Sequence, residues 1–399
     1  MARIDTDILV SGGGVAGLTA AAGFASAGFR VICTDPTPPA TERDAAGADQ
    51  RTTAFLHPSI AVLQAAGLWQ RLEPHAAPLQ IMRIIDAGGP TPEPRITKDF
   101  DAAEISDQPF GWNLPNWLLR REMVARLAEL PGVTFLPGTA TARLMTREAQ
   151  ALATLSDGTT VAARLVVAAD GRASTVREAT GIAVKTIRYG QKALAFATTH
   201  PIPHQNVSTE IHRSGGPFTL VPLPDRDGRP SSAVVWMETG PEVQRLAALP
   251  VPAFEAEINA RSCGILGPLT LVSPRGVWPI ISQIAARMSA ERVALIAEAA
   301  HVVPPIGAQG LNMSLADLAA LLDLATANPA DLGSRAMLDA YHRKRHFEVQ
   351  ARVTGIDALN RASMLGDPAL RDLRAAALNA LYSLAPVRKT LMKAGLGVR

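Results

Sequence analysis

The chain has few cysteines, few aromatic residues and no long apolar run, and these shortages exclude several classes of protein. Its two cysteines, Cys33 and Cys263, cannot form a disulfide framework and supply no CxxC zinc motif. No apolar segment is long enough to cross a bilayer, and Asp5 and Asp7 fall where a signal peptide would be apolar. We therefore expect a cytoplasmic globular protein that binds no structural metal.

Charged residues make up only 19% of the chain, but the basic ones gather near its C-terminal end. Residues 335–399 contain 12 Lys or Arg and 5 Asp or Glu, although the net charge of the whole chain is only +3. A basic tail can bind an anionic membrane surface or nucleic acid. A solvated helix face explains the same pattern equally well.

The first 35 residues predict the opening of a parallel α/β sheet. A short apolar run at 7–10 leads into a glycine-rich turn, and small residues then continue at helical length to about residue 27. A second strand is predicted at 29–34 and ends on Asp35. Strand, turn, helix and strand in this order are typical of a nucleotide-binding fold.

Later segments predict a second sheet of a different kind. We predict helices at 51–72, 116–130 and 311–325, and strands at 81–87, 133–136, 151–155, 165–169 and 292–297. From about residue 183 to residue 280 the pattern becomes one of alternating strands and turns, which is typical of an antiparallel sheet. The remainder is predicted to be helical, with breaks at Pro368 and Pro386.

These elements predict an α/β protein that contains a Rossmann-like nucleotide-binding domain, an inserted antiparallel-sheet domain and a helical C-terminus. The expected limits are 1–80, 108–182 and 276–330 for the first domain, 81–107 and 183–275 for the second, and 331–399 for the C-terminal segment.

The glycine-rich turn predicts a dinucleotide site. Gly12, Gly14 and Gly17 satisfy GxGxxG, in which the glycines allow a tight turn, close approach of the pyrophosphate and close helix packing. The helix that begins at Val15 and Ala16 would present free N–H groups to the phosphates. Asp35, at the end of the next strand, is placed to accept hydrogen bonds from the adenosine ribose.

Two later segments favour FAD over NAD. Residues 166–177 predict a buried strand that ends in Asp170 and Gly171, and residues 291–317 predict another strand, loop and helix. A domain that binds NAD alone needs neither segment.

With these three segments the chain resembles the single-component aromatic hydroxylases that use FAD, of which para-hydroxybenzoate hydroxylase is the familiar member. Within that family it is most similar to the ubiquinone-biosynthesis hydroxylases. The supporting motifs are Arg51-Thr52-Thr53-Ala54, Gly67-Leu68-Trp69, Phe110-Gly111-Trp112, Tyr189-Gly190-Gln191-Lys192-Ala193 and the tail from Pro386 to Gly397. The resemblance covers essentially the whole chain. It implies that the first domain binds FAD, that the antiparallel-sheet domain holds the substrate, and that the substrate pocket lies between the two domains.

The resemblance implies further cofactor contacts. Arg51 would contact the FAD phosphates, and Asn116 and Arg121 would lie on the helix that lines the dinucleotide; a surface ion pair and a solvated face are the respective alternatives for the two arginines. Asp170 would hold structure near the flavin, and Glu298 would hydrogen-bond the ribityl chain. The segment beside the isoalloxazine ring would comprise Pro305, Ile306, Gly307, Ala308, Gln309, Gly310, Leu311 and Asn312.

Three short motifs depart from the expected pattern. Ala297-Glu298 stands where the family usually has Gly-Asp, and Pro304-Pro305 and Ala308-Gln309-Gly310 stand where the ubiquinone branch favours His-Pro and Gly-Gln-Gly. Glutamate keeps the carboxylate at one methylene greater reach. Alanine lacks the freedom of glycine at positive φ, so a turn that needs this conformation is costly here.

The activity implied is hydroxylation of an aromatic ring with O₂, in which NAD(P)H acts as a transient reductant of FAD and the substrate is a lipophilic, polyprenylated phenol. The catalytic candidates are Pro305 and His301, and a hydrogen-bonded structural role is the alternative for His301. Trp278 would lie near the pocket or in the core. His200, His204 and His212 show no spacing that demands a metal.

Other functions remain open. A reductase or oxidase of the same fold would use the same cofactor, and a weakly catalytic subunit of a biosynthetic complex would explain Ala297-Glu298. A flavin halogenase would need a Trp-x-Trp-x-Ile-Pro segment, which is absent. No nucleic acid partner is expected.

Peripheral contact with the inner face of a membrane is predicted for a basic amphipathic helix at the C-terminal end. Packing of this helix on the FAD domain is the alternative. Its basic residues are Arg388, Lys389, Lys393 and Arg399, and its apolar residues are Leu384, Val387, Leu391 and Met392.

Overall fold

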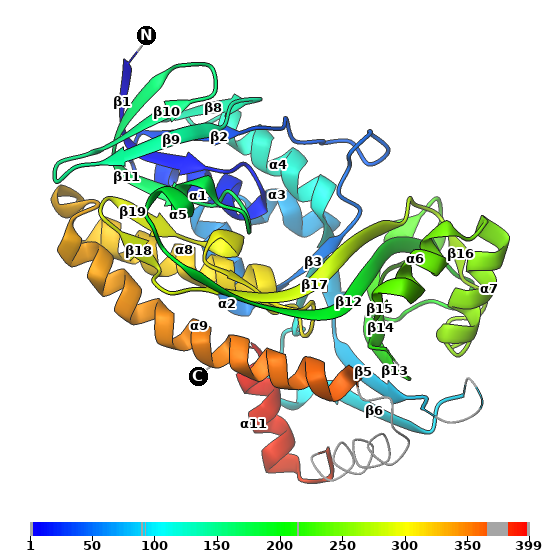
Figure 1. Cartoon of the computed structure of the whole chain (residues 1–399). Helices are drawn as coiled ribbons and strands as arrows, with labels where there is room; N and C mark the ends of the chain where they lie inside the picture. Colours follow the sequence, from blue (N-terminus) through cyan, green and yellow to red (C-terminus); the bar gives the residue numbers. More distant parts are fainter. Residues whose placement is uncertain (1–2, 89–90, 92, 214, 365–381, 397–399) are drawn as a thin grey trace.

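The protein is built on two large β-sheets and one small one. The computed structural model describes residues 3–88, 91, 93–213, 215–364 and 382–396. The two large sheets lie beside each other, and long strands of the second sheet reach toward the first (Figure 1).

The first large sheet has a parallel centre. Its strands run in the order β19-β11-β1-β2-β8, with β18, β10 and β9 added in antiparallel fashion. Their bounds are β1 Arg3–Ser11, β2 Val31–Asp35, β8 Val133–Pro137, β9 Thr141–Thr146, β10 Ala151–Leu155, β11 Thr160–Ala168, β18 Ser289–Ala290 and β19 Val293–Leu295. Parallel strands are covered on both faces, which explains the continuous apolar runs in β1 and β11.

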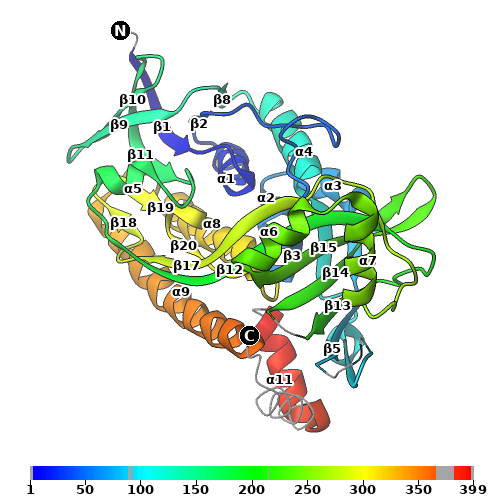
Figure 2. The ribbon, with the colours of Figure 1, turned by 45° about the vertical axis from the view of Figure 1, so that its right-hand side comes forward.

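Helices α1 (Val15–Ser26), α4 (Asn116–Ala128) and α8 (Gln309–Ala327) pack together against this sheet (Figure 2). The nine residues from Ala16 to Phe24 of α1 are all buried. Because most of them are alanine or glycine, α1 can lie close to its neighbours. The short helix α5 (Thr175–Ala179) follows β11.

The second large sheet has the strand order β20-β17-β12-β15-β14-β13-β5-β6, and β16 pairs with β12. All its pairings are antiparallel except that of β13 with β5, which is parallel. The bounds are β5 Ile81–Asp86, β6 Ile96–Asp101, β12 Val184–Thr199, β13 Val207–His212, β14 Pro217–Arg226, β15 Arg229–Thr239, β16 Thr270–Leu271, β17 Gly276–Ala285 and β20 His301–Val302.

This sheet has a core of its own. Helices α6 (Gly240–Ala248) and α7 (Val251–Arg261) accompany it, and Phe254 of α7 packs edge-to-face on Phe196 of β12 at 5.1 Å between ring centroids. Edge-to-face aromatic pairs add to the stabilisation from burial alone.

The strands β12 and β17 connect the two halves of the molecule. They pair from Val184 and Ala285 at one end to Ala195 and Gly276 at the other, with a bulge between Arg188 and Lys192. Figures 1 and 2 show both strands running from the nucleotide-binding half into the second sheet. Residue 276, where we expected the FAD domain to resume, therefore begins a strand that is hydrogen-bonded within the second sheet.

The prediction of one helix over 51–72 is wrong. Residues Thr52–Leu56 form β3, which pairs with β7 (Gly111–Pro115) and, through it, with β4 (Ala77–Leu79) in the small sheet. Helix α2 (His57–Ala65) begins only where Pro58 fixes a helical φ, and the short α3 (Trp69–Leu72) follows. The β-branched Thr52 and Thr53 favour the strand.

Where the structure describes it, the C-terminal part is helical, as predicted. Helix α9 (Arg335–Met364) runs along the outside of the molecule and α11 (Ala385–Leu396) follows it (Figure 1). Pro386 lies in the first turn of α11, a position that proline tolerates well, and Pro368 lies outside the described residues.

The 3₁₀ turns are η1 Glu73–His75, η2 Ala102–Glu104, η3 Ala297–Ala299 and η4 Pro329–Asp331. Within the described ranges, no helix is both long and apolar enough to span a membrane, and no three metal-binding side chains form a cluster.

A buried ion pair joins α8 to α9. Arg345 Nε lies 2.8 Å from Asp317 Oδ1, and the two side chains are 4% and 0% exposed. We expect Arg345→Ala to lower the free energy of unfolding by about 3–5 kcal/mol, because it leaves Asp317 buried without its cation. Urea unfolding measures this. The control, Lys344→Ala, removes an exposed pair with Asp323 and should cost no more than about 1 kcal/mol. Equal losses of stability in the two variants would contradict a special stabilising role for the buried ion pair.

Candidate functional site

The glycine-rich turn brings three stretches of backbone together. A Cβ on Gly12 would lie 2.3 Å from the carbonyl oxygen of Ala169, and a Cβ on Gly17 would lie 1.8 Å from the carbonyl oxygen of Gly12. Gly12 also has φ +111°, which side chains disfavour. A Cβ on Gly14 would meet nothing within 4 Å. Gly12 and Gly17 thus serve packing, whereas Gly14 faces open space at the start of α1.

That open space is a cleft of about 320 Å³ at the carboxyl ends of β1, β2 and β11. Its lining includes Gly12, Gly14, Asp35, Asp170 and Gly171, so five predicted cofactor residues meet in one place. Val15 and Ala16 form the adjoining first turn of α1. No side chain among the described residues caps this helix, which leaves its first N–H groups available to an anion.

Two threonines that the sequence did not single out also line this cleft. The hydroxyl oxygens of Thr34 and Thr141 are buried and have no hydrogen-bond partner among the described residues. A buried hydroxyl without a partner costs free energy, and a polar ligand in the cleft would relieve it. Together with the space above Gly14, these two groups fit a bound dinucleotide.

The carboxylates at the cleft are already ordered by the backbone. Asp35 accepts hydrogen bonds from the N–H groups of Gly13 at 2.6 Å and of Thr37 at 2.8 Å. Asp170 accepts from the Ser174 hydroxyl and from the N–H of Val176. Burial raises the pKa of Asp170 above its usual value, although these two hydrogen bonds oppose the shift. Asp170 thereby fixes the start of α5.

The second and third FAD segments are tied together by Arg177. Its Nη1 donates to the carbonyl of Ala299 at 2.9 Å and its Nη2 donates to the carbonyl of Arg172 at 3.0 Å. The side chain is 3% exposed, and only the structure reveals these partners.

Two alanines in the motifs that depart from the family pattern lie at left-handed positions. Ala297 and Ala308 both have φ +55°, the region that glycine enters without cost. Ala297 therefore lies in the conformation in which alanine is expected to be costly. Ala308 is the N-cap of α8, which begins at Gln309, two residues earlier than predicted. Glu298 is exposed beside this strained turn.

The side-chain amide of Asn312 holds the start of α8 in place. Its Oδ1 accepts from the N–H of Leu56 and the hydroxyl of Ser59, and its Nδ2 donates to the carbonyls of Ala54 and Ala308. Its amide thus ties the start of α8 to β3 and α2. Among the neighbouring predicted residues, Pro305, Gly307, Ala308 and Gly310 are exposed, and Gln309 and Leu311 are half-buried.

Arg51 lies between the nucleotide-binding part and the second sheet. It forms an ion pair with Asp49, and its guanidinium lies over the ring of Trp278 on β17 at 4.9 Å. Burial alone would lower the pKa of Arg51, but the hydrogen bond and charge of Asp49, with a smaller contribution from the charge of Glu298, raise it above its usual value. Asn116 is buried and donates to Asp49. Asp49, two residues before Arg51, is a site residue that the sequence analysis missed.

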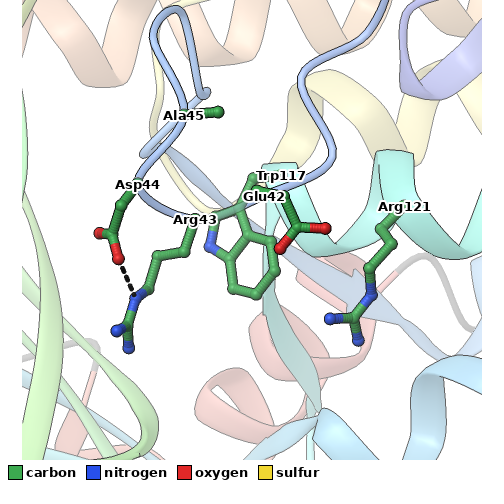
Figure 3. Close-up of a pocket in the computed structure, with 6 residues that line it drawn as sticks. All are labelled: Glu42, Arg43, Asp44, Ala45, Trp117 and Arg121. Carbon is green, nitrogen blue, oxygen red and sulfur yellow. Dashed lines mark hydrogen bonds and ion pairs between the residues drawn. The ribbon is translucent and has the colours of Figure 1, made fainter.

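Arg121 lies apart from this group. It lines a separate pocket with Trp117 and residues 42–45, none of which line the cleft at Gly14 (Figure 3). Its guanidinium lies 5.5 Å from the ring centroid of Trp117, and its Nε donates to Glu122.

His301 is enclosed in the interior. Its Nε2 lies 2.6 Å from Asp317 Oδ2, and the two side chains are 1% and 0% exposed. The same carboxylate binds Arg345. This arrangement matches the structural alternative for His301, and it places β20 firmly against α8.

Comparison with known proteins agrees with this geometry. A family model described as "FAD binding domain" matches residues 5–355. The ubiquinone hydroxylase UbiL of Rhodospirillum rubrum is 34% identical over 396 residues, which are 98% of this chain and 89% of that protein. The 3-demethoxyubiquinol 3-hydroxylase of Escherichia coli is 26% identical over 403 residues and is covered, like this chain, to 100%.

Solved structures share the fold. The p-nitrophenol 4-monooxygenase PnpA of Pseudomonas putida DLL-E4 superposes with a TM-score of 0.80 at 20% identity, over 100% of both chains. The flavin-dependent monooxygenase PieE, solved in complex with FAD and substrate, has a TM-score of 0.74 at 20% identity and matches 100% of this chain and 72% of PieE.

The left-handed turn at Ala297 can be tested directly. We expect Ala297→Gly to raise the free energy of unfolding by about 1 kcal/mol, because glycine relieves the positive φ. The matched control is Ala299→Gly in the same turn, which lacks a positive φ and should lose about 1 kcal/mol. Urea unfolding of both variants decides the matter. A loss of stability in Ala297→Gly would contradict a strained turn.

Substitutions at Gly17 and Gly14 should have different effects, on stability and on FAD binding respectively. Gly17→Ala places a Cβ against the Gly12 carbonyl and should lower the melting temperature by at least about 5 °C. Gly14→Ala should melt like the parent protein but bind FAD at least about tenfold more weakly, since its methyl group enters the cleft. Calorimetric melting of the apoprotein and titration with FAD measure the two effects. Unchanged FAD affinity in Gly14→Ala would place the pyrophosphate elsewhere.

Proposed function

The chain belongs to the FAD-binding-domain family, and on that premise we propose that it is a monooxygenase that hydroxylates a polyprenylated phenol of ubiquinone biosynthesis. The relatives UbiL and 3-demethoxyubiquinol 3-hydroxylase carry names that describe this kind of reaction. Bound FAD, reduced by NAD(P)H, would supply the chemistry by delivering one atom of O₂ to the ring.

One observation supports this function above the others. Strand β20, which directly follows the Ala297–Ala299 turn, pairs with β17 in the second sheet at Ile284 and Gln283. The loop predicted to lie beside the flavin, residues 305–312, therefore closely follows an edge strand of the sheet predicted to hold the substrate. This shared backbone would keep the cofactor and the substrate in register, which hydroxylation requires.

The chain's own residues would bind the cofactor and orient it beside the substrate. The first turn of α1 and Gly14 would hold the pyrophosphate, and Asp35 would accept from the ribose. The start of α8 would present its backbone N–H groups to the flavin. Pro305, exposed in the loop before α8, would limit the approach of water to the reacting ring.

Isotope labelling tests the activity. Protein loaded with FAD is mixed with NADH or NADPH, ¹⁸O₂ and a prenylated phenol carried in detergent. The proposal expects one ¹⁸O atom in the product for each NAD(P)H oxidised. Hydrogen peroxide as the only product would instead support an oxidase, and failure to take up FAD would support a non-catalytic subunit.

We also propose that α11 contacts an anionic membrane that carries such a substrate. Lys389 and Lys393 are exposed on this helix and Leu384, just before it, is 58% exposed. Arg388 and Met392 instead face inward: Arg388 pairs with Glu104, and Met392 packs with Leu56, Ala102 and Phe110. Arg399 and the side chains of Val387 and Leu391 lie outside the described part.

Liposome binding tests this contact. Replacing Lys389 and Lys393 by alanine should weaken binding to phosphatidylserine vesicles at low salt by about 30-fold, at about 1 kcal/mol per lysine. Lys344→Ala, on the distant helix α9, is the matched control and should leave binding unchanged. Equal binding by all three proteins would refute the contact.

A further inference from the structure

Arg51 is held in one orientation by a single carboxylate. Its Nε and Nη2 donate to the two oxygens of Asp49 at 2.8 and 2.7 Å, and its own backbone N–H donates to Asp49 Oδ1 at 3.1 Å. The Asp49 side chain is 7% exposed, whereas the Arg51 side chain is 41% exposed. A bidentate pair of this kind fixes both the position and the plane of a guanidinium.

Asp49 is in turn fixed from behind. Asn116 Nδ2 donates to Asp49 Oδ2 at 3.0 Å, and the Thr53 hydroxyl donates to Asn116 Oδ1 at 2.8 Å. Arg120 lies 3.8 Å from the same carboxylate. Burial alone would raise the pKa of Asp49, but the hydrogen bonds and charges of Arg51, Asn116 and Arg120 lower it below its usual value. The carboxylate therefore stays ionised at neutral pH.

The opposite face of Arg51 meets the second sheet. Its guanidinium carbon lies 4.9 Å from the centroid of the Trp278 ring on β17. Trp278 fits there because Gly276 has no side chain: a Cβ on Gly276 would lie 2.0 Å from the indole. With Nε and Nη2 bound to Asp49, Arg51 Nη1 has no hydrogen-bond partner among the residues described.

We propose that Asp49 is a positioning residue for the cofactor: it clamps Arg51 against Trp278 so that Nη1 is aimed at the FAD phosphates. Through the same guanidinium, occupation of the cofactor site is transmitted to β17, a strand of the substrate sheet. This inference rests on the proposed function, because it needs FAD as the ligand.

A competing role for Asp49 predicts the opposite change in FAD affinity. If Asp49 merely competed with the phosphates for Arg51, removing its charge would free the cation and tighten FAD binding. If Asp49 positions Arg51, removing the charge leaves a mobile guanidinium, and FAD binding weakens. The sign of the change in affinity therefore separates the two roles.

The experiment is calorimetric titration of the full-length apoprotein with FAD. Asp49→Asn should raise the Kd for FAD about tenfold, and Arg51→Gln should raise it by at least as much. The double variant should bind like Arg51→Gln alone, because Asp49 acts only through Arg51. The matched control is Asp5→Asn, an exposed aspartate near the other end of β1 that pairs with Arg3, and it should leave the Kd unchanged.

Two further variants exclude a general loss of structure. Asp49→Glu keeps the charge and should recover part of the affinity lost in Asp49→Asn. Trp278→Phe should weaken FAD binding about threefold in the parent protein and have no effect in Asp49→Asn.

Each negative outcome overturns one conclusion. An unchanged or lower Kd in Asp49→Asn, or additive losses in the double variant, would overturn the positioning role and leave the proposed function intact. Parent protein that takes up no FAD would instead overturn the proposed function.

Discussion

The close approach of three backbone segments at the start of α1 is the constraint on which the site depends. A side chain at Gly12 or Gly17 would collide with the carbonyl of Ala169 or of Gly12. Because neither position carries a side chain, β1, β11 and α1 can pack closely together. The cleft above Gly14 lies where they meet. The buried run of small residues in α1 and its packing on α4 and α8 follow from the same closeness.

The two halves of the molecule are joined at several points around this cleft. Strands β12 and β17 run continuously from one half to the other, and β20 adds the segment after Ala297–Ala299 to the same sheet. Arg177 ties that segment to the loop after β11. The ion pair of Arg345 with Asp317 fixes α9 to α8. A cofactor placed in the cleft would thus contact elements that are rigidly connected to the substrate sheet.

Sequence patterns predicted the parallel sheet, the first glycine motif and the carboxylates Asp35 and Asp170, because these depend on local spacing and on runs of apolar residues. They failed over 52–56, where β7, far along the chain, supplies the partner of the strand. They missed Asp49, Thr34 and Thr141 for the same reason, since the roles of these residues arise from contacts with distant segments. The only local signals for these residues were that Thr34 directly precedes Asp35 and that Asp49 lies two residues before Arg51.

A crystal structure of the FAD complex would test the central claim most directly. The account predicts the pyrophosphate at hydrogen-bond distance from the first N–H groups of α1, beside Gly14, with Arg51 Nη1 on a phosphate oxygen and the pair with Asp49 intact. A dinucleotide bound in the pocket at Trp117 and Arg121, or an Arg51 turned away from Asp49, would contradict it.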